Sequence, residues 1–182
     1  MRRVVIANND EGKITEASCK EFLKHFISTC DKPYLVKAAK KIKAVKIGAD
    51  PSMNLKSVGV IGAQMSINLK TMTMYFSTHS QWGEWKLDER ALCHELGHLM
   101  YQSIVGKPQA LAFKAAVLEE LAKGKDICDY QSRVYDRYKK KIVGADLVAH
   151  ESFAEWVKFG DSQSRGCPKQ YEAFKACLKI LS

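Results

Sequence analysis

Apolar residues recur three and four positions apart in the first part of the chain, which is the spacing of one face of an α-helix. Over residues 13–30 this face consists of Cys19, Phe22, Leu23, Phe26 and Ile27. Pro33 begins the next element, where the pattern predicts a short helix near 34–41 and then a strand over 42–48. Residues 57–77 are rich in Val, Ile, Thr, Met and Tyr and predict two short strands.

The second part of the chain has helical spacing nearly throughout. We expect helices over 87–105, 108–123, 126–142, 146–159 and 168–181. Glycines separate them, at Gly106, Gly124, Gly144 and Gly160. A small N-terminal sheet and a helical C-terminal half predict an α+β fold, and the 182 residues suit a single domain over 1–182.

One of these predicted helices carries a metal-binding motif. Residues 94–98 read His-Glu-Leu-Gly-His, and histidines at i and i+4 lie on one face of a helix, where their imidazoles can converge on zinc. Glu95 lies on the flank of that face and can take a proton from a water that zinc activates. Asp88 is the expected N-cap, and an apolar stripe is formed by Leu92, Leu96 and Leu99.

A catalytic zinc uses three protein ligands and leaves the fourth position to water or substrate. The expected third ligand lies in the helix around Glu151 and Glu155, which share one face. One carboxylate can bind zinc, while the other can accept the free ring N–H of a ligating histidine. His150 is the rival ligand, but it lies about 100° around the helix from Glu151, so both cannot easily point at one metal.

The HExxH motif and the downstream Glu-x-Phe-Ala-Glu helix together resemble a family of zinc peptidases, the gluzincins, whose third ligand is Glu. They are similar to the anthrax lethal factor catalytic domain, the clostridial Pro-Pro endopeptidases and peptidase domains of phage head-morphogenesis proteins. The resemblance covers roughly residues 58–182. It includes 66–69, similar to a strand ahead of the zinc helix, and 168–171, similar to the closing helix. It implies a zincin-like fold with a small mixed sheet packed on the HExxH helix.

The resemblance also implies roles for individual residues. The Zn²⁺ ligands would be His94, His98 and Glu151, with Glu95 as the general base and Glu155 as hydrogen-bond partner of a ligating histidine. Family members often carry a Tyr seven residues before the ligating Glu, poised to stabilise the oxyanion; here that position is Gly144. Tyr138 and Tyr135 lie upstream and are the candidates for this role.

Peptidases of this kind pair an extended substrate with an edge strand beside the zinc helix. The segment 57–63, which contains Gly59 and Gly62, is the candidate edge strand, and an ordinary hairpin is the alternative. A polar and aromatic loop over 78–87 carries Trp82 and Trp85, which either line a substrate groove or form a packing lid.

The net charge of +9 comes partly from basic runs at 37–46 and 139–141. Solvated element faces account for both, and an acidic peptide, an anionic assembly or a nucleic acid would also suit the charge. Six cysteines are scattered without a CxxC motif, and no apolar run is long enough for a signal peptide or a membrane span. We therefore expect a cytoplasmic or virion-associated protein with reduced thiols and no membrane partner.

These features predict a zinc-dependent endopeptidase that acts on a peptide or protein substrate. A repressor-cleaving peptidase of mobile elements is one alternative, because that group also favours His-Glu-Leu-Gly-His. Another is a non-catalytic zinc-binding interaction module of a phage or mobile element, in which Gly144 marks lost turnover. A third is a basic nucleic-acid-binding protein with an incidental HExxH. Metal content separates the third alternative from the others, and peptide hydrolysis separates the module from the enzymes.

Overall fold

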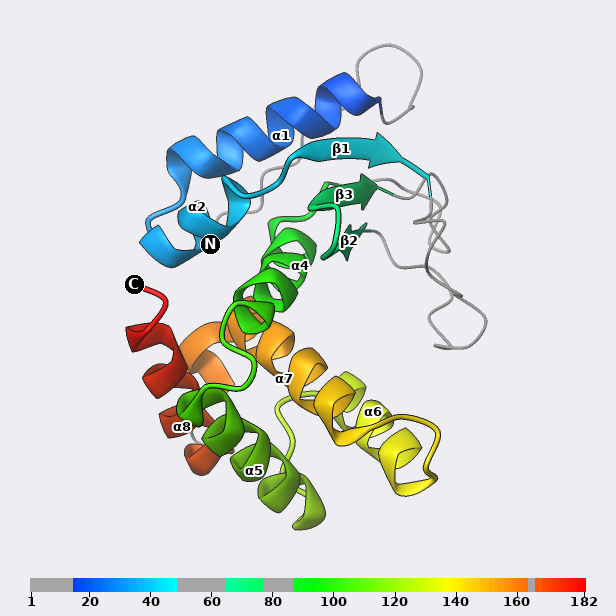
Figure 1. Cartoon of the computed structure of the whole chain (residues 1–182), viewed down its shortest axis with the longest axis vertical. Coiled ribbons are helices and arrows are strands. Elements are labelled where there is room, and N and C mark those ends of the chain that lie inside the picture. The colour runs from blue at the N-terminus through cyan, green and yellow to red at the C-terminus, as the bar shows by residue number, and fades with distance from the viewer. Residues whose placement is uncertain (1–14, 49–64, 77–86, 164–165) are drawn as a thin grey trace. The chain divides into compact units, whose positions relative to one another are not determined.

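The computed structural model describes residues 15–48, 65–76, 87–163 and 166–182. In these ranges the chain is mostly helical with a small sheet, so the predicted α+β class is confirmed (Figure 1). The chain forms two compact units, Met1–Glu95 and Leu96–Ser182. Their boundary falls inside helix α4 (Glu89–Gln102), so one continuous helix belongs to both. A single domain over 1–182 stays a prediction.

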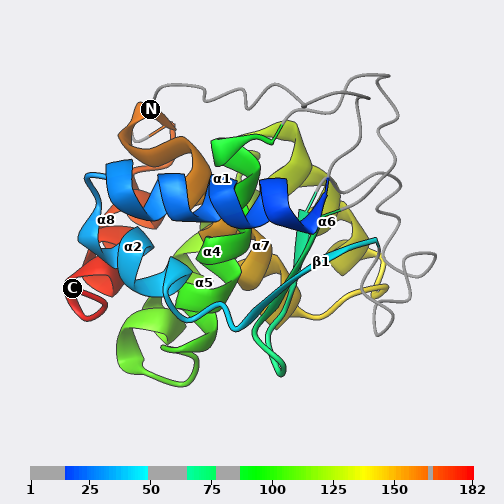
Figure 2. The same ribbon diagram turned by 90° about the horizontal axis from the view of Figure 1, so that it is seen from above.

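The first unit begins with helix α1 (Glu16–Thr29), as the apolar spacing predicts. Its start is capped by Thr15, whose hydroxyl accepts the backbone N–H of Ser18 while the Ser18 hydroxyl accepts the N–H of Thr15. The apolar face of α1 is buried, and Phe22 meets Phe76 edge to face with ring centroids 6.5 Å apart. Helix α1 also contacts strand β1 (Ala44–Ile47), which runs beside it (Figures 1 and 2).

Between α1 and β1 lies helix α2 (Pro33–Ala39), with Pro33 in its first turn as the sequence indicates. The predicted basic run follows α2 into β1, and its lysines are exposed: Lys37, Lys40, Lys41, Lys43 and Lys46. The run therefore forms an exposed face that leads from a helix into a strand, and an anionic partner for it stays a prediction.

The sheet is mixed and has the order β1-β3-β2. Strands β2 (Met65–Asn68) and β3 (Thr73–Phe76) lie within the segment 57–77, for which strands are predicted; they pair antiparallel, and β1 pairs with β3 in parallel. All four residues of β3 are buried, as expected for a central strand. The candidate edge strand 57–63 and the loop tryptophans, Trp82 and Trp85, lie outside the described residues.

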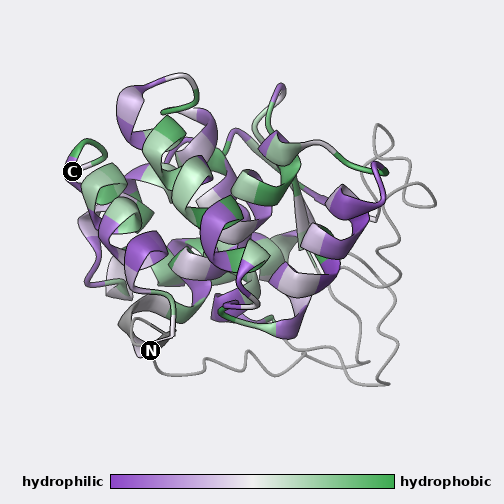
Figure 3. Cartoon of the chain, turned by 90° about the horizontal axis from the view of Figure 1, so that it is seen from below, coloured by the Kyte–Doolittle hydropathy of each residue, from purple (hydrophilic) through white to green (hydrophobic). Residues whose placement is uncertain are grey.

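The second unit is a helical assembly around α7 (Ala145–Phe159), which contacts α5 (Pro108–Ala122), α6 (Asp129–Lys139) and α8 (Pro168–Lys179). A 3₁₀ turn, η1 (Gly160–Gln163), follows α7. Each of these helices has an apolar and a polar side (Figure 3). Their apolar sides and Tyr101 of α4 form an aromatic core that consists of Tyr101, Phe113, Phe153, Trp156 and Phe174.

The predicted helices of this half are confirmed within a few residues at each end. Gly106, Gly124 and Gly160 have φ values of 84°, 72° and 62°, the left-handed region that ends helices. The buried carboxylate of Glu120 on α5 accepts backbone N–H groups of Lys169 and Gln170 at 3.2 and 3.0 Å, and so caps the start of α8. No helix in the described ranges has the length and apolar character that crossing a membrane requires.

Candidate metal centre

Helix α4 presents the HExxH residues on a well-supported scaffold. The Asp88 carboxylate accepts the backbone N–H of Arg90 at 2.9 Å, which confirms the predicted N-cap. The predicted stripe of Leu92, Leu96 and Leu99 is buried. This stripe packs one side of the helix into the core. His94, Glu95 and His98 lie on the flank of that side and are half-buried.

The small residues of the two motifs let α4 and α7 approach closely. A Cβ atom built at Gly97 would lie 2.6 Å from the Cα of Ala154, well inside contact distance, and 3.3 Å from the Cβ of Val157. Gly97 precedes His98, and Ala154 lies between Glu151 and Glu155. The glycine of the first motif and the alanine of the second therefore set the distance between the helices that carry the metal-ligand candidates.

Three of the predicted ligands converge. His94, His98 and Glu151 each offer a ligand atom, and these atoms all lie within 4.8 Å of one another. The Nε2 atom of His98 is 3.6 Å from Oε2 of Glu151. Ligand atoms about 2.0–2.2 Å from one tetrahedral zinc lie about 3.3–3.6 Å apart, so this separation suits a shared metal ion. Two imidazoles and one carboxylate are also a donor set that catalytic zinc uses.

The carboxylates of α7 have separate hydrogen-bond donors. The Tyr130 hydroxyl donates to Oε2 of Glu151 at 3.1 Å. The Cys128 thiol donates to Oε2 of Glu155 at 3.3 Å, and the Lys158 ammonium lies 3.4 Å from Oε1 of Glu155. Glu155 is buried and Glu151 is partly exposed. The buried carboxylate is therefore charge-paired, as a carboxylate in that environment must be.

His150, the rival ligand, packs differently. Its ring stacks on His98 with centroids 5.9 Å apart and meets Tyr101 edge-on at 4.7 Å. Burial lowers the pKa of His150, which favours its neutral form. Within the described ranges the cluster of potential ligands contains Glu151 and not His150, as the angular separation on the helix predicts.

The tyrosine beside Glu151 is one that sequence reasoning missed. Tyr135 and Tyr138 lie on the same helix as Tyr130, and their rings contact each other with centroids 5.7 Å apart. Relative to Tyr130 they lie about 140° and 80° around α6, and Tyr138 is about 12 Å further along its axis. Gly144 is the N-cap of α7, with no atom within 4 Å of the position that a Cβ would occupy.

The only sequence signal for Tyr130 is its place in the first turn of a helix that contacts α7, and that contact is not visible in the sequence. Cys128, at the N-cap of the same helix, was missed for the same reason. Burial, with a further contribution from the charge of Glu155, raises the pKa of the Cys128 thiol to about 11. At neutral pH this thiol is therefore protonated and can donate a hydrogen bond.

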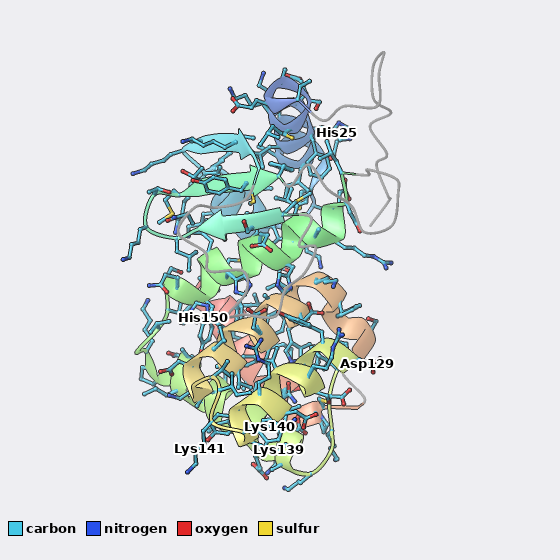
Figure 4. The ribbon with its side chains drawn as sticks, turned by 90° about the vertical axis from the view of Figure 1, so that its right-hand side faces the viewer. His25, Asp129, Lys139, Lys140, Lys141 and His150 are labelled. Carbon is cyan, nitrogen blue, oxygen red and sulfur yellow. The ribbon has the colours of Figure 1, made fainter. Side chains whose placement is uncertain are left out.

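The remaining cysteines have no apparent part in the centre. None of the six cysteines forms a disulfide within the described residues, and Cys93, next to His94, is fully buried, which raises its pKa to about 12. It packs in the core, as expected from its place on the helix. The second basic run, Lys139 to Lys141, is exposed at the far end of α6 from Asp129 (Figure 4).

Comparisons with protein-family models, with curated proteins and with solved structures find no match to this chain.

Proposed function

We propose that this chain is a zinc-dependent endopeptidase of the gluzincin kind, with a peptide or protein as its substrate. The observation that carries the proposal is the convergence on one point of His94, His98 and Glu151, of which Glu151 lies 57 residues after His94 in the sequence. If the two histidines were an incidental pair on a surface helix, a third ligand of the correct type would not be expected beside them from another helix. The half-buried Glu95 beside this cluster supports a catalytic role over a purely structural one.

The chemistry that zinc supplies when bound is a lowered pKa of water and polarisation of the scissile carbonyl. His94, His98 and Glu151 would hold the metal as its three protein ligands. Glu95 takes the proton of the attacking water and delivers it to the leaving amine nitrogen. Glu155 keeps its proposed role as the hydrogen-bond partner of a ligating histidine, and its burial limits its movement.

The test combines metal analysis with peptide hydrolysis. Reconstituted wild-type protein should carry close to one zinc per chain and cleave members of a broad peptide library. Glu95→Gln should keep the zinc and the fold and lose at least about 10²-fold in kcat, since an amide cannot accept the proton. Glu89→Gln, in the first turn of the same helix and about 9 Å along its axis, is the matched control and should retain activity. Wild type that holds no zinc after reconstitution contradicts the proposal.

A non-catalytic zinc-binding module is the second candidate, favoured by Gly144 at the position where related peptidases often have Tyr. Loss of one oxyanion donor typically costs about 10²–10³-fold in kcat. Wild type and Glu95→Gln that both bind zinc, with no library peptide cleaved by either, would favour the module over the peptidase.

A further inference from the structure

Two hydrogen-bond donors at the start of α6 each contact one carboxylate of α7. Cys128 and Tyr130 are two residues apart, and Glu151 and Glu155 are one helical turn apart. The thiol reaches Glu155 at 3.3 Å and the phenol reaches Glu151 at 3.1 Å. We call Cys128 and Tyr130 the α6 donor pair.

The phenol and a histidine converge on the same carboxylate oxygen. Oε2 of Glu151 accepts from Tyr130 and lies 3.6 Å from Nε2 of His98. The oxygen that faces the ligand cluster is thus the one that Tyr130 holds. A glutamate side chain has several accessible rotamers, and a fixed donor reduces their number before any metal binds.

The Tyr130 ring is itself held in place. The guanidinium carbon of Arg133 lies 5.8 Å from the centre of the ring. Arg133 is exposed and Tyr130 is half-buried, so neither residue belongs to the aromatic core of this unit. The phenol contacts the ligand cluster through its hydrogen bond to Glu151.

We infer that Tyr130 is a positioning residue that orients Glu151 for metal binding, with Cys128 doing the same for Glu155. This inference rests on the proposed function insofar as it takes Glu151 for a zinc ligand. Both members of the pair act as neutral hydrogen-bond donors. This role differs from the oxyanion stabilisation that the resemblance implies for Tyr135 or Tyr138, which stays a prediction.

The experiment measures metal binding and needs no turnover. Zinc affinity is determined by competition with a chromogenic chelator, and ligand geometry by the visible absorption of the Co²⁺-substituted protein. Tyr130→Phe should weaken zinc binding about 10–100-fold and change the Co²⁺ spectrum. Tyr135→Phe, on the same helix but away from Glu151, is the matched control and should behave as wild type. Metal-free Tyr130→Phe should melt at the wild-type temperature, which separates lost positioning from lost stability.

Cys128 has its own pair of variants. Cys128→Ser keeps an O–H donor and should retain most of the zinc affinity, while Cys128→Ala removes the donor and should weaken it. Zinc affinity and Co²⁺ spectrum of Tyr130→Phe equal to those of Tyr135→Phe would overturn the inference. Wild type that binds neither zinc nor Co²⁺ would overturn both the inference and the proposed function. A chain that binds zinc but cleaves no peptide contradicts only the peptidase, because the Tyr130→Phe comparison still decides the inference.

Discussion

At the residue scale, the two glutamates of α7 have different environments although they share one helix face. Glu151 is partly exposed and lies 3.6 Å from His98, whereas Glu155 is buried and accepts hydrogen bonds from Cys128 and Lys158. A ligand that shares its coordination sphere with water or substrate must be accessible, and a residue that holds a ligand in place need not be. This difference supports the proposal that Glu151 binds the metal and that Glu155 holds a ligand in place.

The assignment predicts unequal effects on zinc affinity. Glu151→Ala should remove most bound zinc because it deletes one of three ligands, and His98→Ala should do the same. Glu155→Ala should weaken zinc binding only about 10–100-fold. His150→Ala is the control, since His150 is not in the ligand cluster, and it should leave the affinity near wild type. Chelator competition measures all four variants, and loss of the metal from His150→Ala alone would show that the rival ligand is the true one.

At the element scale, the candidate metal centre depends on how closely α4 and α7 approach. The backbone of α7 at Ala154 leaves no room for a side chain at Gly97. An alanine in a helix interior is normally about 1 kcal/mol more favourable than glycine. Here the steric term opposes that gain, and because a backbone atom is the nearest neighbour, relief requires the helices to move apart.

Gly97→Ala should therefore destabilise the protein by about 1–3 kcal/mol and also weaken zinc binding, because separating the helices separates their ligands. Gly144→Ser is the matched control: its Cβ position is open, its φ is −84°, and serine is a favourable N-cap residue. It should be neutral or slightly stabilising. Thermal melting measures the stability of each variant, and chelator competition measures its zinc affinity. A Gly97→Ala protein more stable than wild type would mean that the close contact is absent in solution.

At the scale of the whole molecule, the proposed zinc site would couple metal binding to folding. The three ligand candidates come from two helices whose meeting depends on tertiary packing, so the unfolded chain has no comparable site. A metal that binds only the folded state stabilises it in proportion to the logarithm of its concentration over Kd.

Wild type at a free zinc concentration of 100 Kd should gain about 2.7 kcal/mol. For a chain of this length that corresponds to a rise in Tm of about 5–10 °C. Differential scanning calorimetry with and without zinc measures the shift, and a chelator should reverse it. His98→Ala should show no such rise at the same zinc concentration, and an equal rise in that variant would indicate binding elsewhere on the chain.

Much of the helical structure and most of the candidate centre could be read from the sequence, because both depend on local spacing. The HExxH pattern places two histidines on one face of α4 irrespective of the rest of the fold, and the Leu92, Leu96 and Leu99 stripe identifies the buried face. The same angular argument favoured Glu151 over His150, and the structure groups Glu151 with the histidines.

The tertiary structure decided which side chains from other elements contact the ligand candidates on α4 and α7. Tyr130 and Glu151 are 21 residues apart, and Cys128 and Glu155 are 27 apart. Their contacts depend on the packing of α6 against α7, which no helical period encodes. For this reason the sequence does not indicate that Tyr130 contacts the carboxylate of Glu151. Periodicity determines which face of a helix a residue occupies, and only the packed fold determines what that face meets.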